Sequence, residues 1–211
     1  CTAPDNGGGT ATLPPAAPNV SCPSGYASPS DTLHIIDGLP PGTRIDITGE
    51  LTGFVGVMAS PGGSLGGEVQ DFGAQIEMEM KGTGTLAGYV RSATMPNVFC
   101  QTHSAPRSAG AFVQGFDTDF HQLQGQLPLG DPDFDLLRIT AGTGFGMPSP
   151  GHTTLMRTGD DWNVDSFFDI TYRIDFVGAP GGALAGRSGS TTGTIRMQLG
   201  QAAIFDHLEC F

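Results

Sequence analysis

Residues 166–176 read Ser-Phe-Phe-Asp-Ile-Thr-Tyr-Arg-Ile-Asp-Phe. From Phe168 to Phe176 apolar and polar side chains alternate, and this period of two places the apolar side chains on one face of a β-strand. Residues 76–81 and 195–199 alternate in the same way. Shorter strands, separated by clusters of glycine, proline, asparagine and aspartate, are predicted at residues 33–37, 86–91, 111–116, 134–140 and 153–157. Because no window of a dozen residues shows the apolar spacing of a helix, the sequence predicts an all-β fold.

Two parts of the chain carry the same series of short motifs. Residues 46–80 contain Asp-Ile-Thr, Phe-Val-Gly, Pro-Gly-Gly and an alternating strand, and residues 169–199 contain them in the same order. The interval from the proline of the loop to the isoleucine that begins the second strand is fifteen residues in both parts. This similarity predicts a duplicated strand–Pro-Gly-Gly loop–strand module. We expect a first β module at residues 32–125 and a second at residues 126–211, arranged as two small β-sandwiches or as one β-sandwich with related halves.

Residues 1–31 form a segment rich in proline and glycine that precedes the first predicted strand. Such a segment cannot build a core of its own and favours extended conformations. We therefore predict an extended N-terminal arm, held by a disulfide through Cys22 or by the surface of a neighbouring subunit. Strand addition to a neighbour's sheet would bind the arm through main-chain hydrogen bonds. The sparse apolar residues Leu13, Val20 and Tyr26 are the expected subunit contacts.

The chain of 211 residues is acidic and has few charged residues. It has 21 Asp and Glu against 9 Lys and Arg, a formal net charge of −12, and Lys81 is its only lysine. Phosphate backbones and anionic lipids require a basic surface, so nucleic-acid binding and docking to anionic membranes are excluded. The apolar runs are only a few residues long, so we expect no transmembrane helix.

The four cysteines, Cys1, Cys22, Cys100 and Cys210, are widely spaced and form no Cys-x-x-Cys pair. Zinc-ribbon, thioredoxin-like and c-haem sites are therefore excluded, and the spacing favours disulfides in an oxidising compartment. The connectivity stays open, because four cysteines allow three pairings. Cys1, followed by a flexible polar stretch, is similar to the lipidated start of a bacterial lipoprotein, whereas a bridged Cys1 lets all four cysteines pair. We expect the N-terminus of a processed, secreted protein.

Two longer stretches resemble known sequences. One is Gly-Asp-Pro-Asp-Phe-Asp-Leu-Leu-Arg-Ile-Thr at residues 130–140, which continues to residues 148–155. The other begins at residues 164–170 and continues to Ser-Gly-Ser-Thr-Thr-Gly-Thr-Ile-Arg-Met at residues 188–197. Both resemble segments of secreted, glycine-rich, β-type proteins of unassigned function from planctomycete-like bacteria, and the resemblance covers residues 33–200. It implies a secreted bacterial protein and brings with it no activity and no catalytic residue.

Two groups of side chains with oxygen atoms at alternate positions are candidates for calcium binding. The groups are Asp131, Asp133 and Asp135, and Asp161, Asn163 and Asp165. Alternating oxygen ligands in a turn hold hard cations, but neither group has the glycine and glutamate of an EF-hand loop. The alternative is that these residues form solvated turns beside strands.

The motifs for catalysis are weak. Residues 62–66, Gly-Gly-Ser-Leu-Gly, match Gly-x-Ser-x-Gly, but a nucleophile elbow joins a strand to a helix, whereas this motif joins two predicted strands. The second copy has Ala183 in place of Ser64. No two histidines stand at metal-ligand spacing, so a metallohydrolase would need the fold to bring distant ones together. The histidines are His34, His103, His121, His152 and His207. We expect no enzyme, and no cofactor other than calcium.

These features together predict an extracellular or cell-surface structural protein of a bacterium. It would be a subunit of a filament, sheath or matrix that assembles with copies of itself. The acidic charge would give solubility before assembly, and the arm would suit strand addition. The alternative is a secreted calcium- or carbohydrate-binding β module with a lipid anchor at Cys1. A single tryptophan, Trp162, and three tyrosines are too few for an obvious aromatic platform for sugars.

Overall fold

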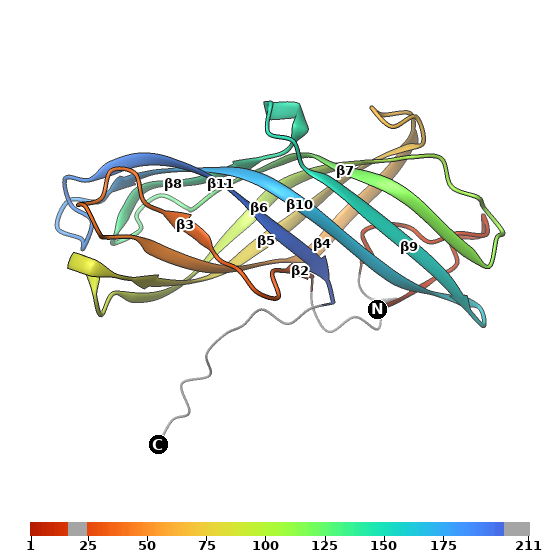
Figure 1. Cartoon of the computed structure of the whole chain (residues 1–211), viewed down its shortest axis with the longest axis horizontal. Coiled ribbons are helices and arrows are strands. Elements are labelled where there is room, and N and C mark those ends of the chain that lie inside the picture. The colour runs from red at the N-terminus through yellow and green to blue at the C-terminus, as the bar shows by residue number, and fades with distance from the viewer. Residues whose placement is uncertain (17–24, 201–211) are drawn as a thin grey trace, which may run out of the picture.

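The computed structural model describes residues 1–16 and 25–200, and it confirms the all-β prediction (Figure 1). The strands are β1 (Thr2–Pro4), β2 (Tyr26–Ala27), β3 (Leu33–Ile35), β4 (Ile45–Pro61), β5 (Glu68–Gly82), β6 (Val90–Ser104), β7 (Val113–Gln126), β8 (Phe134–Ala141), β9 (Pro150–Thr158), β10 (Asp161–Gly178) and β11 (Ser188–Leu199). Two short 3-10 turns, η1 (Gly84–Leu86) and η2 (Thr143–Phe145), interrupt the loops. Among the residues described, no helix is long and apolar enough to cross a membrane.

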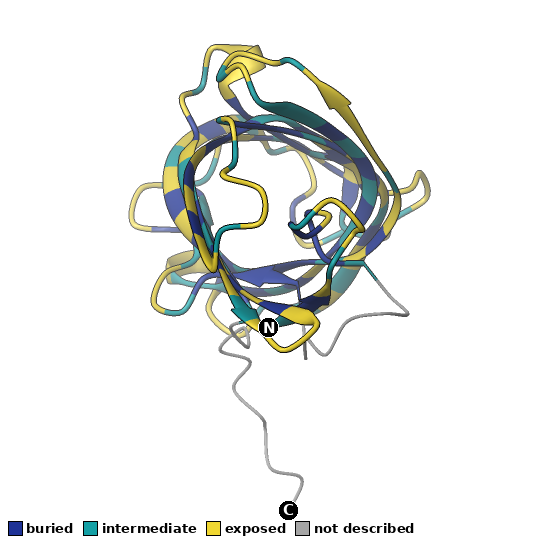
Figure 2. Cartoon of the chain, turned by 90° about the vertical axis from the view of Figure 1, so that its right-hand side faces the viewer, coloured by how far each residue is buried: buried dark blue, intermediate teal, exposed yellow. Residues whose placement is uncertain are grey.

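All strands belong to one antiparallel sheet, and this sheet closes on itself. The order β10-β11-β2-β4-β5-β6-β7-β8 ends with β8 paired back to β10, so the strands form a cylinder that Figure 2 shows end-on. At the seam between β7 and β10, β8 pairs with both strands at one end of the cylinder and β9 pairs with both at the other. The predicted β-sandwich is therefore wrong, because closure gives the long strands two neighbours without a second sheet.

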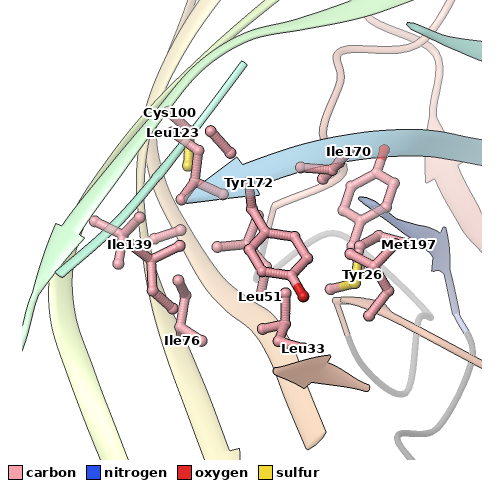
Figure 3. Packing of buried hydrophobic residues seen from close by; sticks show 14 of the residues in the cluster. Tyr26, Leu33, Leu51, Ile76, Cys100, Leu123, Ile139, Ile170, Tyr172 and Met197 are labelled. Carbon is pink, nitrogen blue, oxygen red and sulfur yellow. The ribbon is translucent and has the colours of Figure 1, made fainter. Parts of the chain in front are cut away.

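The apolar faces of the strands line the inside of the cylinder, as the alternation predicts. On β10, the five apolar residues from Phe168 to Phe176 are at most 5% exposed, and the polar residues between them face outward. The rings of Tyr26, Phe54, Phe72, Phe120 and Phe168 contact one another edge-on or tilted across the interior. The cavity among the apolar side chains, whose packing Figure 3 shows, has a volume of about 40 Å³. On this measure one water molecule needs about 10–15 Å³, so the cavity has room for only a few waters, and the interior is a packed core rather than a ligand chamber.

The two Pro-Gly-Gly loops lie at the tips of two antiparallel hairpins, β4–β5 and β10–β11. β4 and β10 run in opposite directions, so the tips point to opposite ends of the cylinder. The registers differ by four residues: Ile47 lies opposite Met80, whereas the matching Ile170 lies opposite Ile195 rather than Leu199. The duplication is thus not reproduced in the strand pairing and stays a prediction. The proposed boundary between residues 125 and 126 falls inside β7, one residue before its end, and β7 and β8 pair with each other in the common sheet.

The N-terminal segment belongs to the sheet and core of its own chain. β1 pairs with β10, and β2 lies between β11 and β4, so the closed sheet contains the predicted arm. Leu13 is 7% exposed and Tyr26 is 3% exposed. The prediction that these two residues contact a neighbouring subunit is therefore wrong, and Val20 lies outside the described residues. The sequence missed this role because a strand of two residues has no alternation to detect.

The cysteines do not all pair. In the described part of the chain, Cys100 is a free thiol that points into the core with 0% exposure, and burial raises its pKa above the ordinary value. The predicted participation of Cys100 in a disulfide is therefore wrong, because its side chain belongs to the apolar lining of β6. At most one bridge can then form among Cys1, Cys22 and Cys210, and Cys22 and Cys210 lie outside the described residues. Cys1 is disulfide-bonded, as predicted, and which cysteine it pairs with stays a prediction.

Candidate metal centre

The first predicted calcium group is held together by an arginine. Asp131 Oδ1 accepts the backbone N–H groups of Asp133 and Phe134, each at 3.0 Å, and Asp131 Oδ2 forms an ion pair with Arg91. Asp133 Oδ2 lies 2.6 Å from Arg91 Nη1, and Asp133 Oδ1 accepts the N–H of Ala183. Burial alone would raise the pKa of Asp133, but the N–H of Ala183 and the guanidinium of Arg91 outweigh it and hold that pKa below its usual range. These contacts give the two carboxylates a structural role, tying three segments of the chain together.

The other predicted calcium ligands remain on the surface. Asp135 is exposed on β8, and Asp161, Asn163 and Asp165 are exposed at alternate positions of β10. Alternate residues of one strand are about 6.6 Å apart, which is wide for ligands of a single ion. Calcium binding at Asp161, Asn163 and Asp165 stays a prediction.

A different group of potential ligands comes together on β6 and β7. Within residues 1–16 and 25–200, the one group of three His, Cys, Asp or Glu side chains within reach of a common ion is His103, Asp119 and His121, whose ligand atoms all lie within 4.8 Å of one another. His103 on β6 lies directly opposite Asp119 on β7. The register then shifts, from Thr102 opposite Phe120 to Gln101 opposite Gln122, and His121 is the extra residue. Such an irregularity changes the direction of a side chain, and here it places the His121 ring beside Asp119 and against the His103 ring.

The group lies on the outer face of the sheet, where two loops cover it. The β4–β5 loop (residues 62–67) packs on His103: a Cβ at Gly63 would lie 3.1 Å from His103 Cγ. The β8–β9 loop (residues 142–149) packs on His121: a Cβ at Gly144 would lie 2.9 Å from His121 Nε2. Both loops stand on the same side of the molecule in Figure 1. As a result His103 is only 6% exposed and Asp119 only 8% exposed.

The polar atoms of the group are incompletely paired. Asp119 Oδ1 accepts a hydrogen bond of 2.5 Å from the Thr143 hydroxyl of η2. Asp119 Oδ2 and His121 Nδ1 are both buried, lie 3.6 Å apart, and have no hydrogen-bond partner among the described residues. Buried polar atoms without a partner cost about 1–3 kcal/mol each. Two of them facing each other therefore indicate a site for a missing partner.

The two histidine rings are stacked, and His103 has the charge state that a metal ligand requires. The rings of His103 and His121 stack with centroids 4.0 Å apart and planes 20° apart. Burial and the neighbouring His121 lower the pKa of His103, and together they outweigh the carboxylates of Asp119 and Asp71, which raise it. His103 is thus neutral at pH 7, the form in which imidazole binds metal. A metal ion lies in the plane of each imidazole that binds it, so coordination by both requires one ring to turn. His121, with 24% of its side chain exposed, is the less buried of the two.

Ser64 of the Gly-x-Ser-x-Gly motif reaches the same place. The motif joins strand to strand, as predicted, so it is no nucleophile elbow. The Ser64 hydroxyl nevertheless lies 2.8 Å from His103 Nδ1. The other ring nitrogen of His103 faces the side-chain oxygen of Gln101 at 3.3 Å rather than a carboxylate, so the orienting acid of a catalytic triad is replaced by an amide.

This group was not predicted from the sequence because the histidines are scattered along the chain. The available signal was Asp-Phe-His at residues 119–121: on a strand, residues two apart share a face. Of the other histidines, His34 pairs with Asp46 and His152 pairs with Asp117, and His207 lies outside the described residues. Neither pair gains a third ligand within the described residues.

Comparison with known proteins gives no further assignment. No protein-family model, no curated protein and no solved structure matches this chain. The resemblance to glycine-rich planctomycete proteins accordingly stays a prediction from the sequence.

Proposed function

We propose that this chain is an extracellular protein that binds one divalent transition-metal ion through His103, Asp119 and His121. Two imidazole nitrogens and one carboxylate oxygen are a ligand set that zinc and its neighbours accept. Three protein ligands leave a fourth position of a tetrahedral ion for water or another ligand.

The observation that carries this proposal is the 3.6 Å separation of Asp119 Oδ2 and His121 Nδ1. A direct hydrogen bond between nitrogen and oxygen is about 2.7–3.2 Å long, so the pair is too far apart for one. Two ligand atoms bound to zinc at about 2.1 Å with a tetrahedral angle are about 3.4 Å apart. The spacing of the two unpaired atoms thus suits an ion between them better than a shared proton.

The extracellular location is part of the proposal and rests on the acidic composition and the wide cysteine spacing. Assembly into a homopolymer is not part of it, because β2 and the buried Leu13 and Tyr26 belong to the chain's own core. A lipid anchor at Cys1 is not part of it either, because the sulfur of Cys1 is disulfide-bonded. Trp162 is 0% exposed, so it offers no platform for a sugar, and carbohydrate binding loses its one aromatic candidate of that size.

The test is a zinc titration of the full-length protein after removal of metal with a chelator. We expect one site per chain in isothermal titration calorimetry. His121→Ala and Asp119→Asn each remove a ligand, and we expect the zinc affinity to fall by at least about 100-fold. Loss of a residue that only hydrogen-bonds to a ligand already lowers metal affinity about 10–100-fold.

The matched control is His152→Ala. His152 also pairs with a carboxylate, since its Nδ1 lies 3.0 Å from Asp117 Oδ1. Among the described residues, however, this pair has no third potential metal ligand beside it. Its zinc affinity should equal that of the unmodified protein. Absence of binding by the unmodified protein, or an equal loss in all three variants, would refute the proposal.

A further inference from the structure

Ser64 is brought to the metal centre by a loop built from glycines. Gly62, Gly63 and Gly66 have φ values of +126°, +84° and +79°, which side chains other than hydrogen resist. The Gly62 N–H donates to the Gly67 carbonyl, and the Gly67 N–H donates to the Ser104 carbonyl of β6, which folds the loop over the strand. Because residue 63 lacks a Cβ, the backbone approaches the His103 ring closely enough for Ser64 to reach it.

The contacts of the His103 ring fix its proton in the metal-free state. The Ser64 backbone N–H donates to His103 Nδ1 at 3.1 Å, so Nδ1 accepts and the ring proton lies on Nε2. Nε2 then faces Gln101 Oε1 at 3.3 Å, and the Gln101 amide in turn donates to Asp71 at 2.8 Å. Because Nδ1 is bonded to Ser64, Nε2 is the nitrogen that is left for a metal ion. Binding there breaks only the long hydrogen bond of 3.3 Å to Gln101 Oε1.

Metal binding at Nε2 moves the proton of the neutral ring to Nδ1. A histidine ligand normally donates this second N–H to an oxygen, which fixes the tautomer and the ring orientation. The Ser64 hydroxyl, 2.8 Å from Nδ1, is placed to accept it. A hydroxyl donates or accepts as required, so the same side chain serves both states. In the metal-bound state the Ser64 backbone N–H, which donates to Nδ1 without metal, has to turn away from the protonated Nδ1.

We infer that Ser64 is the positioning residue of the metal centre: it orients His103 by accepting the Nδ1 proton when the metal is bound. This inference rests on the proposed metal binding at His103, Asp119 and His121. It gives the Gly-x-Ser-x-Gly motif a role in ligand orientation instead of nucleophilic attack. Loss of such a second partner lowers metal affinity about 10–100-fold.

The experiment compares the zinc affinities of four full-length proteins by competition with a chromophoric chelator: unmodified, Ser64→Ala, Ser64→Thr and Ser60→Ala. Ser64→Ala should bind zinc about 10–100-fold more weakly. Ser64→Thr keeps the hydroxyl, and residue 64 is exposed, so this variant should keep the affinity of the unmodified protein. Ser60→Ala, at an exposed serine of β4, should leave it unchanged.

A second readout, the tautomer of His103, separates orientation from a merely structural role. Nitrogen-15 NMR of the imidazole should show the proton on Nε2 without metal and on Nδ1 with zinc. Equal zinc affinity of Ser64→Ala and the unmodified protein, or a zinc-bound His103 still protonated on Nε2, would overturn the inference while leaving metal binding intact. If the unmodified protein binds no zinc, both proposals fail.

Discussion

Replacing Leu13 by alanine tests whether the N-terminal segment is part of the chain's own core. Leu13 is 7% exposed and lines a small internal space with Tyr26, Phe72 and Phe168, whereas Leu129 is 83% exposed. The two leucines therefore allow the same substitution at a buried and at an exposed position. A residue that served only as a contact between subunits would leave the stability of the isolated chain unchanged.

The expected magnitude for Leu13→Ala follows from the carbons removed. Three buried carbons at about 0.8 kcal/mol each give about 2.4 kcal/mol of lost transfer free energy. The remaining cavity adds to this, because strands fixed on both sides cannot collapse into it, and buried leucine-to-alanine changes cost about 2–5 kcal/mol. We expect the unfolding free energy to fall by about 3 kcal/mol in Leu13→Ala and by less than about 0.5 kcal/mol in Leu129→Ala.

The assay is urea unfolding at two protein concentrations, followed by far-ultraviolet circular dichroism and by the fluorescence of Trp162. Trp162 is fully buried and its indole N–H donates to Asp5 of the N-terminal segment at 3.1 Å, so the fluorescence reports on that segment and the dichroism reports on the sheet. The two transitions should coincide at both concentrations. Stabilities of the two variants within about 0.5 kcal/mol of each other would show that Leu13 is not part of the core and restore it as a subunit contact.

Three further outcomes are expected. Iodoacetamide at pH 8 should leave Cys100 unmodified in the folded protein and modify it in urea, because the thiol is 0% exposed with a raised pKa; mass spectrometry of labelled folded protein would contradict this if it found Cys100 modified. The folded-state pKa of Asp133 lies below its unfolded value, so the stabilisation by its carboxylate is present above about pH 4 and is lost as pH falls through the folded-state pKa. Asp133→Asn should therefore lower the unfolding free energy more at pH 7 than at pH 2.5. Equal losses at the two pH values in urea titrations would argue against the pairing with Arg91. A Cβ at Gly25 would lie 1.6 Å from the carbonyl oxygen of Leu51. Gly25→Ala should therefore prevent β2 from pairing with β4 and lower the unfolding free energy by about 4 kcal/mol or more. An unchanged melting temperature would mean that β2 is not needed for closure.

The sequence predicts the strands but not how they close. The alternation at residues 168–176 correctly assigns the inward and outward faces of β10, because burial on one side of a strand imposes a period of two. Closure depends on β2, which contributes only Tyr26 and Ala27 between β11 and β4. Two residues carry no periodicity, and the prolines and glycines around them indicate an extended arm. Only the packing of Tyr26 against Phe54 and Phe168 shows that the segment is part of the core.

The candidate metal centre was not predicted from the sequence for a related reason. Asp119 and His121 are close in sequence, but their common face is apparent only once β7 is known to extend past Phe116, where the sequence prediction ended that strand. The register of β6 with β7 then brings His103 opposite Asp119, and pairing register is set by the whole sheet rather than by either strand alone. The predicted carboxylates Asp131 and Asp133 have the expected spacing for calcium, but Arg91, 40 residues or more away in the chain, is what they bind.

The most direct test of the metal centre is a crystal structure of the full-length protein grown with zinc, with diffraction recorded above and below the zinc absorption edge. We expect an anomalous peak on the outer face of β6 and β7. The peak should lie about 2.0–2.2 Å from one ring nitrogen each of His103 and His121 and from a carboxylate oxygen of Asp119. Zinc bound elsewhere, with Asp119 Oδ2 and His121 Nδ1 still 3.6 Å apart and nothing between them, would contradict it.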